Sequence, residues 1–338
     1  MIQLLYIGNR LRQGRANVSA IDALGPLLEN EGYGVYYAST KNNKLVRMFD
    51  MLMAVIRYGH KVDAVLIDTY STLNFYYALS VSQICRMLNI PYIPILHGGH
   101  LERRLKHNPK MSQLVFGHSR ANVAPSGYIK TVFERYGYNE LKFIPNAIQI
   151  DRYPILQKEY TDIRLLWVRS FSEIYNPCMA VRVLKTLSDQ GFLARLCMVG
   201  PDSDGSLKKV KMLADALEVE VEFTGKLSKQ EWIQLSEQYN FFINTTTVDN
   251  MPVSVMEAMA LGFPVISTDV GGMPYLIENK ENGLLVPNNA VDAMAKAVTM
   301  LYGDEVLRNK IINGARKKAE QLDWGMVKQA WHDVLKGL

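Results

Sequence analysis

The decisive stretch of the sequence reads Asp249-Asn-Met-Pro-Val-Ser-Val-Met-Glu257, followed by Ala-Met-Ala-Leu-Gly262-Phe-Pro264-Val-Ile-Ser-Thr-Asp-Val-Gly271-Gly272. Pro252 is typical of a helix start, Gly262 and Pro264 end that helix, and a buried strand follows. The N-terminus of such a helix offers free N–H groups and a partial positive charge to a diphosphate. Carboxylates on either side can accept hydrogen bonds from sugar hydroxyls. An ordinary helix with two solvated acids would show the same spacing.

The pattern extends well beyond these two acids. It resembles the E-x7-E region of retaining GT-B glycosyltransferases, in particular glycosyltransferase family four, with Asp249 at the first Glu and Glu257 at the second. The segments after Glu257 continue the resemblance, through Gly262-Phe-Pro264-Val-Ile and Asn282-Gly283-Leu-Leu-Val-Pro287. Further matches cover most of the remaining chain, at Phe143–Asp151, Arg164–Arg169, Leu196–Pro201 and Val221–Gly225. The first half matches more weakly, at Leu4–Gly14 and Ile95–Gly99.

Strand-like and helix-like runs alternate along the whole chain, which predicts an α/β protein with parallel sheets and right-handed crossovers. The 338 residues suffice for two cores. We therefore expect two Rossmann-like domains, and the resemblance implies a GT-B fold in which their sheets face an interdomain cleft. The expected boundaries are 1–150 for an acceptor-side domain and 151–323 for a nucleotide-sugar-binding domain. The resemblance also implies that a final helix, 324–338, crosses back to the first domain.

Composition excludes several classes of protein. The first residues lack the basic region and cleavage site of a signal peptide, and no apolar run reaches the ~18 residues of a spanning helix. Cys85, Cys178 and Cys197 are widely spaced in apolar contexts, which is typical of free thiols in a reduced cytoplasm and not of a disulfide or zinc set. We expect a cytoplasmic protein without a bound cofactor or metal.

Charge is unevenly distributed. Residues 1–150 carry 17 Lys and Arg against 9 Asp and Glu, a net +8, whereas the remainder carries 21 against 24, a net −3. The basic first half indicates an anionic partner, for which a phosphorylated acceptor, an anionic membrane at the inner face and a nucleic acid remain open. No nucleic-acid motif accompanies the charge, so we expect no nucleic-acid partner.

Arg169 directly follows a strand-like run and is the predicted cation for the diphosphate. A guanidinium can fork onto phosphate oxygens and stabilise a leaving group, and the family resemblance gives Arg169 that catalytic role. The family places a Lys five positions later, where this chain has Ile174. Lys226 or an arginine of the first domain could replace that Lys, or the helix N-terminus could carry more of the charge. The alternative is that Arg169 is an ordinary surface arginine at the end of a strand.

The resemblance implies that Asp249 binds the donor sugar and that Glu257 accepts hydroxyls of the nucleotide ribose. Further predicted nucleotide-sugar contacts are Met251, Pro252, Val253 and Ser254 at the helix start, with Thr247, Gly200 and Lys226. Thr245, Thr246 and Thr247 could equally be ordinary threonines at a strand end.

The first half contributes two further predictions. His97 ends an apolar strand before Gly98-Gly99-His100, and the resemblance implies that it meets the donor sugar; His100 is the alternative. Gly14 matches the second glycine of a family loop near the donor phosphates. Neither histidine has a Cys or acid at metal-ligand spacing in the sequence.

The leading hypothesis is a retaining, metal-independent, hexosyltransferase-type glycosyltransferase. It would move a sugar from a nucleoside-diphosphate sugar to a hydroxyl of a glycan or lipid-linked acceptor in surface polysaccharide synthesis. Two alternatives stay open: a non-transferring GT-B enzyme such as a nucleotide-sugar 2-epimerase, and a nucleotide-sugar-binding protein with impaired catalysis.

Overall fold

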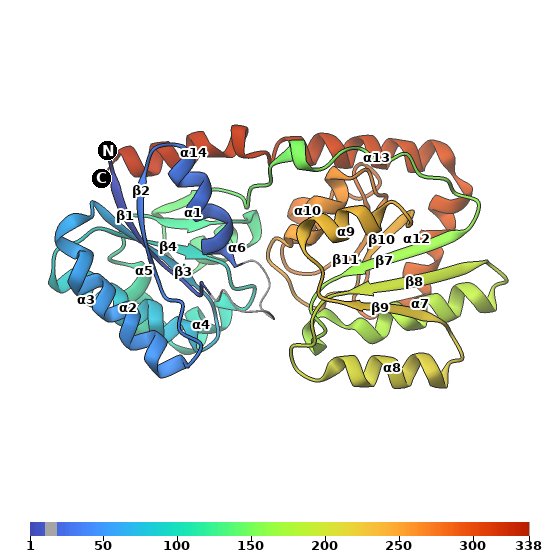
Figure 1. Ribbon diagram of the computed structural model, residues 1–338, viewed down its shortest axis with the longest axis horizontal. Coiled ribbons are helices and arrows are strands. Elements are labelled where there is room, and N and C mark those ends of the chain that lie inside the picture. The colour runs from blue at the N-terminus through green and yellow to red at the C-terminus, as the bar shows by residue number, and fades with distance from the viewer. Residues whose placement is uncertain (11–18, 338) are drawn as a thin grey trace. The chain divides into compact units, whose positions relative to one another are not determined.

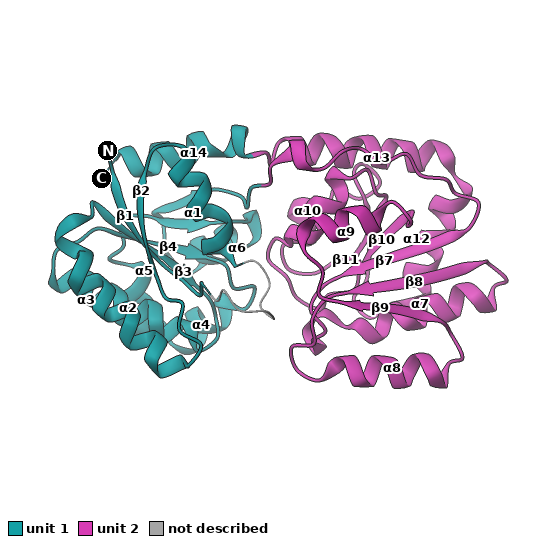
Figure 2. Cartoon of the chain, viewed as in Figure 1, with its two compact units in different colours: residues 1–147, 324–338 teal, residues 148–323 magenta. Residues whose placement is uncertain are grey.

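The computed structural model describes residues 1–10 and 19–337. The chain divides into two compact units (Figure 2), with Met1–Ala147 and Trp324–Leu338 in unit 1 and Ile148–Asp323 in unit 2. The chain thus leaves unit 1 after Ala147 and re-enters it at Trp324. Each unit has its own parallel sheet and its own apolar cores on both faces of that sheet.

Unit 1 is built on a six-stranded parallel sheet of order β2-β1-β3-β4-β5-β6 (Figure 1). The strands are β1 (Gln3–Ile7), β2 (Gly34–Ala38), β3 (Ala64–Thr69), β4 (Tyr92–Leu96), β5 (Asn122–Ala124) and β6 (Leu141–Phe143). The helices are α1 (Ala20–Asn30), α2 (Lys44–Tyr58), α3 (Asn74–Met87), α4 (Leu101–His107), α5 (Pro109–Phe116), α6 (Gly127–Arg135) and α14 (Trp324–Lys336), with a 3₁₀ turn η1 at Gly59–Lys61.

Alternation along β1 explains the two layers of helices in unit 1. Leu5 and Ile7 point to the core shared with α2, α3, α4, α5 and α6. Leu4 and Tyr6 point to the opposite core, which α1 and α14 cover. Because side chains of a strand alternate between faces, an apolar run buried on both sides is what a central parallel strand requires.

Unit 2 repeats the plan with the strand order β12-β11-β10-β7-β8-β9. Its strands are β7 (Ile163–Val168), β8 (Ala194–Val199), β9 (Val221–Gly225), β10 (Phe241–Asn244), β11 (Val265–Thr268) and β12 (Leu284–Val286). Its helices are α7 (Pro177–Asp189), α8 (Ser206–Ala216), α9 (Lys229–Ser236), α10 (Val253–Ala260), α11 (Met273–Leu276), α12 (Val291–Gly303) and α13 (Glu305–Glu320), with 3₁₀ turns η2 (Ile150–Arg152) and η3 (Glu173–Tyr175).

Two parallel sheets covered by helices confirm the predicted α/β class. Strands β6 and β12 have three residues each, and hydrophobic periodicity alone does not identify a strand of that length. No helix in the described ranges is long and apolar enough to cross a bilayer.

Helix α14 supplies a large part of one core of unit 1, and this generates a stability prediction. Trp331 is 4% exposed in that core, whereas Met326 on the same helix is 69% exposed. Trp331→Ala should lower the free energy of unfolding by about 3–5 kcal/mol, because it removes buried area and leaves a cavity. Met326→Ala is the matched control and should change it by less than ~0.5 kcal/mol. Urea unfolding followed by circular dichroism makes the comparison; equal midpoints would show that α14 is not part of this core.

Candidate active site

Polar side chains gather at the carboxyl end of the sheet in unit 2. Arg169 directly follows β7, and Asp249 lies in the loop between β10 and α10. An ion pair joins Nη2 of Arg169 to the carboxylate of Asp249. The guanidinium also stacks over the ring of Tyr175, 4.2 Å from its centroid. Nε of Arg169 is buried and has no hydrogen-bond partner among residues 1–10 and 19–337, so one donor of the guanidinium is unsatisfied.

Glycines let the backbones at this edge approach each other closely. A Cβ on Gly200 would lie 1.8 Å from the carbonyl oxygen of Arg169. Likewise, a Cβ on Gly271 or Gly272 would lie 2.2 Å from the oxygen of Asp249 or 1.6 Å from that of Asn250. Gly272 N–H donates to the Asp249 carbonyl at 2.9 Å. These glycines therefore determine where Arg169 and Asp249 lie. Gly200 lies against the backbone of Arg169, the residue predicted to bind the phosphate.

Glu257 lies on α10 and is 3% exposed. Its Oε1 accepts a hydrogen bond from the hydroxyl of Tyr153 at 2.8 Å and forms an ion pair with Lys229. Burial, followed by the nearby Glu257 carboxylate, raises the pKa of Tyr153. Arg316 donates to the carbonyls of Tyr153 and Ala260, both at 2.7 Å, and so holds Tyr153 against the end of α10.

The start of α10 carries the remaining predicted contacts. Met251 and Pro252 are buried, and Pro252 is the residue before the first helical turn. Val253 is exposed at 38%. The hydroxyl oxygen of Ser254 is buried and has no hydrogen-bond partner within the described part of the chain. A buried hydroxyl at a helix N-terminus is a suitable donor to a phosphate oxygen.

The threonines before Asp249 form hydrogen bonds that involve η3. This turn contains Ile174, the residue at the position of the family's lysine. The hydroxyl of Thr247 donates to the carbonyl of Ile174 at 2.8 Å, and its N–H donates to the same oxygen at 2.8 Å. Thr246 donates to Val248 O at 2.8 Å, and Thr245 donates to Tyr175 O at 2.8 Å. The hydroxyls of Thr245 and Thr247 therefore position η3, including Tyr175, whose ring contacts the guanidinium of Arg169.

Lys229 and Tyr153 were not among the residues predicted from the sequence, whereas Lys226 was predicted as a cation for the diphosphate. Lys226 is exposed after β9, whereas Lys229, three positions later, contacts Glu257. The signal for Lys229 was present, since Ser228 and Glu231 form a capping box that places Lys229 in the first turn of α9. Tyr153 gave no such signal, because its partner lies 104 positions away.

A second polar cluster lies at the carboxyl end of the sheet in unit 1. Nε2 of His97 lies 2.9 Å from Oδ1 of Asp68, and the hydroxyl of Tyr6 donates to the same oxygen at 3.0 Å. The His97 ring stacks on Tyr70, with 5.3 Å between centroids. Asp68 was not predicted, although it ends the apolar run of β3. His100 is exposed and begins α4; His97 is thus the one of the two that belongs to this cluster.

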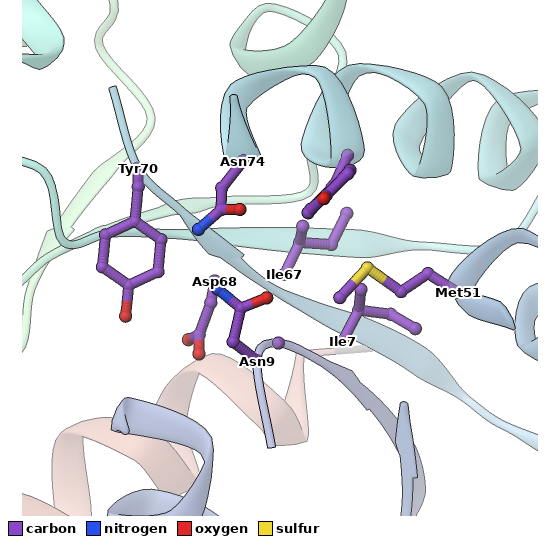
Figure 3. A pocket seen from close by; sticks show the side chains of 9 residues that line it. Ile7, Asn9, Met51, Ile67, Asp68, Tyr70 and Asn74 are labelled. Carbon is purple, nitrogen blue, oxygen red and sulfur yellow. The ribbon is translucent and has the colours of Figure 1, made fainter. Parts of the chain in front are cut away.

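Figure 3 shows a small pocket beside this cluster, with Asp68, Asn9, Tyr70 and Asn74 around it. The second oxygen of Asp68 is buried and lacks a hydrogen-bond partner among the described residues. Gly14, the remaining predicted contact, lies outside the described residues. Within those residues, no three His, Cys, Asp or Glu side chains are grouped as metal ligands would be.

Part of the chain is similar in sequence to known glycosyltransferases. Residues 153–318 match the family model of glycosyl transferases group 1. The amylovoran biosynthesis glycosyltransferase AmsK of Erwinia amylovora is 30% identical over 166 residues, which cover 47% of this chain and 40% of AmsK. The chain spans less than half the length of the curated relatives that it matches.

Solved structures resemble the whole chain. The sucrose-phosphate synthase of Thermosynechococcus elongatus has a TM-score of 0.85 at 15% identity, with full coverage of both chains. HepE of Anabaena, solved with UDP-glucose, has a TM-score of 0.81 at 19% identity, again with full coverage. At these identities the likeness concerns the fold, and it confirms the predicted GT-B architecture.

The close backbone contacts at Gly272 generate a prediction. Gly272→Ala should lower the free energy of unfolding by about 1–3 kcal/mol, because the new Cβ must displace the carbonyl of Asn250. Gly303→Ala is the matched control, since nothing lies within 4 Å of its Cβ position. Thermal unfolding of both variants is the measurement. Equal unfolding temperatures of Gly272→Ala and Gly303→Ala would show that the loop of Asp249 accommodates a side chain at position 272.

Proposed function

We propose that this chain, whose residues 153–318 match the family model of glycosyl transferases group 1, transfers a sugar from a nucleoside-diphosphate sugar to a hydroxyl of a glycan or lipid-linked acceptor. The observation that carries the proposal is the pairing of Arg169 with Asp249 beside the start of α10. An arginine with an unsatisfied donor, a helix N-terminus and a carboxylate that can accept sugar hydroxyls are the groups that a nucleotide sugar needs. The polysaccharide relatives support a role in surface polysaccharide synthesis.

In this proposal Arg169 receives the diphosphate of the donor. An incoming phosphate competes with Asp249 for the guanidinium, and the released carboxylate of Asp249 then accepts hydroxyls of the donor sugar. The N–H groups at the start of α10 and the hydroxyl of Ser254 contribute further donors to the phosphate. Glu257 binds the ribose hydroxyls, for which Lys229 and Tyr153 hold its carboxylate in place.

Bond breaking in the donor leaves negative charge on the departing phosphate, and Arg169 stabilises that charge. The acceptor oxygen bonds to the sugar on the face that the phosphate leaves, and the leaving phosphate takes the acceptor proton. This route gives retention and requires no protein base and no metal ion. In support, Asp202 and Asp204, which have the Asp-x-Asp spacing of metal-dependent transferases, accept hydrogen bonds from the N–H groups of Gly205 and Ser206 and so cap α8.

Arg169 has the sharpest kinetic prediction. Arg169→Ala should reduce turnover about 100–1000-fold, because a preorganised donor to the leaving group is lost. Arg169→Lys should recover little, since an ammonium cannot fork onto two oxygens. Arg182→Ala, which removes an exposed arginine of α7, is the control. Steady-state kinetics test this; an Arg169→Ala enzyme that keeps more than about a tenth of wild-type turnover would assign the role to another cation.

The class of reaction is tested separately from the role of Arg169. A thermal-shift screen of nucleoside diphosphates and nucleotide sugars identifies the donor, because a ligand at 100 times its dissociation constant adds about 2.7 kcal/mol of stability. Sugar transfer with retained anomeric configuration in the presence of a chelator is the expected result. Donor binding without transfer or hydrolysis would support the binding-protein alternative, and release of an epimerised sugar would support the 2-epimerase.

A further inference from the structure

Helix α2 presents an apolar stripe to solvent. Leu45 is 80% exposed, Phe49 66%, Met53 43% and Ile56 54%, with Val46 beside them at 49%. The spacings of four, four and three residues place the first four of these side chains on one face of the helix. Single exposed apolar residues are common on proteins, but a continuous stripe along a helix of 15 residues marks an interaction surface.

The stripe is not a displaced part of the core. The opposite face of α2 is buried through Met51, Ala54 and Val55, which pack into the core of unit 1. Helix α2 also packs against α3 in the same layer, and Figure 1 shows the two helices beside each other. The helix therefore already buries one apolar face, and the exposed stripe is a second one.

Positive charge surrounds the stripe. Residues 41–61 contain five Lys or Arg and a single acid. Lys41 and Lys44 at the start of α2, and Arg57 and Lys61 at its end, are exposed. The acid, Asp50, accepts a hydrogen bond from the hydroxyl of Ser39. The exposed face of α2 is thus apolar along its length and cationic at both ends.

We propose that α2 docks unit 1 on the surface of an anionic lipid bilayer. Leucine, phenylalanine and methionine side chains enter the boundary between headgroups and acyl chains, while flanking lysines and arginines contact lipid phosphates. Charge complementarity favours lipid over a second copy of this chain, because pairing two α2 helices would bring like charges together. The docking does not depend on the proposed sugar transfer.

Vesicle binding by the full-length protein, without donor or acceptor, tests the proposal. The wild-type chain should co-sediment with vesicles of phosphatidylcholine and phosphatidylglycerol, but weakly with phosphatidylcholine alone, and added salt should reduce binding. Changing Phe49 and Met53 together to Ser should weaken partitioning about tenfold or more. Lys44→Gln should weaken partitioning about fivefold, and only onto the anionic vesicles.

Leu193→Ser is the control, since Leu193 is 78% exposed in unit 2; it should bind vesicles like the wild type. Circular dichroism confirms that each variant is folded. Three results would overturn the proposal: equal binding to neutral and anionic vesicles, unchanged binding of the Phe49 and Met53 variant, or a wild-type dimer in solution that this variant dissolves. Because no sugar is transferred in the assay, failure here is distinguishable from failure of the proposed function.

Discussion

The ion pair between Arg169 and Asp249 is the interaction on which the proposed site of unit 2 depends. It connects the end of β7 with the loop that leads into α10. Both side chains are largely buried, and a buried charge is tolerated only where it is paired. Gly200, Gly271 and Gly272 allow the backbones of both partners to lie where the pair forms. The site therefore needs both the pairing of two buried charges and the absence of side chains at these glycines, all at the carboxyl end of the sheet in unit 2.

The same principle governs Glu257, whose carboxylate is paired with Lys229 and hydrogen-bonded by Tyr153. Each carboxylate of the sequence motif thus has its own cation. Removing one partner of a buried pair typically costs about 3–5 kcal/mol, because the other charge is left uncompensated. A ligand that replaces a partner must supply compensating contacts of its own, and hydroxyl and phosphate groups of a nucleotide sugar have the chemistry to do so.

The sequence predicted much of this architecture and less of the site. Apolar runs and the glycine and proline signals around Asp249 were enough for the α/β class, and the family resemblance for the GT-B fold. Strands of three residues, such as β6 and β12, are too short for hydrophobic periodicity alone to identify them. Tyr153 and Asp68 escaped because their partners are 104 and 29 positions away. The capping box places Lys229 in the first turn of α9, but its contact with Glu257 spans 28 positions. Contacts of that kind follow from tertiary packing, which no local pattern encodes.

Calorimetric titration of a nucleoside diphosphate into the wild type and into Asp249→Asn tests directly whether Arg169 is the cation that receives the diphosphate. In the wild type the diphosphate must compete with Asp249 for Arg169. Asn keeps the size of the side chain but removes its charge, so the guanidinium is left in need of an anion. Asp249→Asn should therefore bind the diphosphate more tightly than the wild type does. Unchanged or weaker binding by a folded Asp249→Asn variant would show that Arg169 is not the cation that receives the diphosphate.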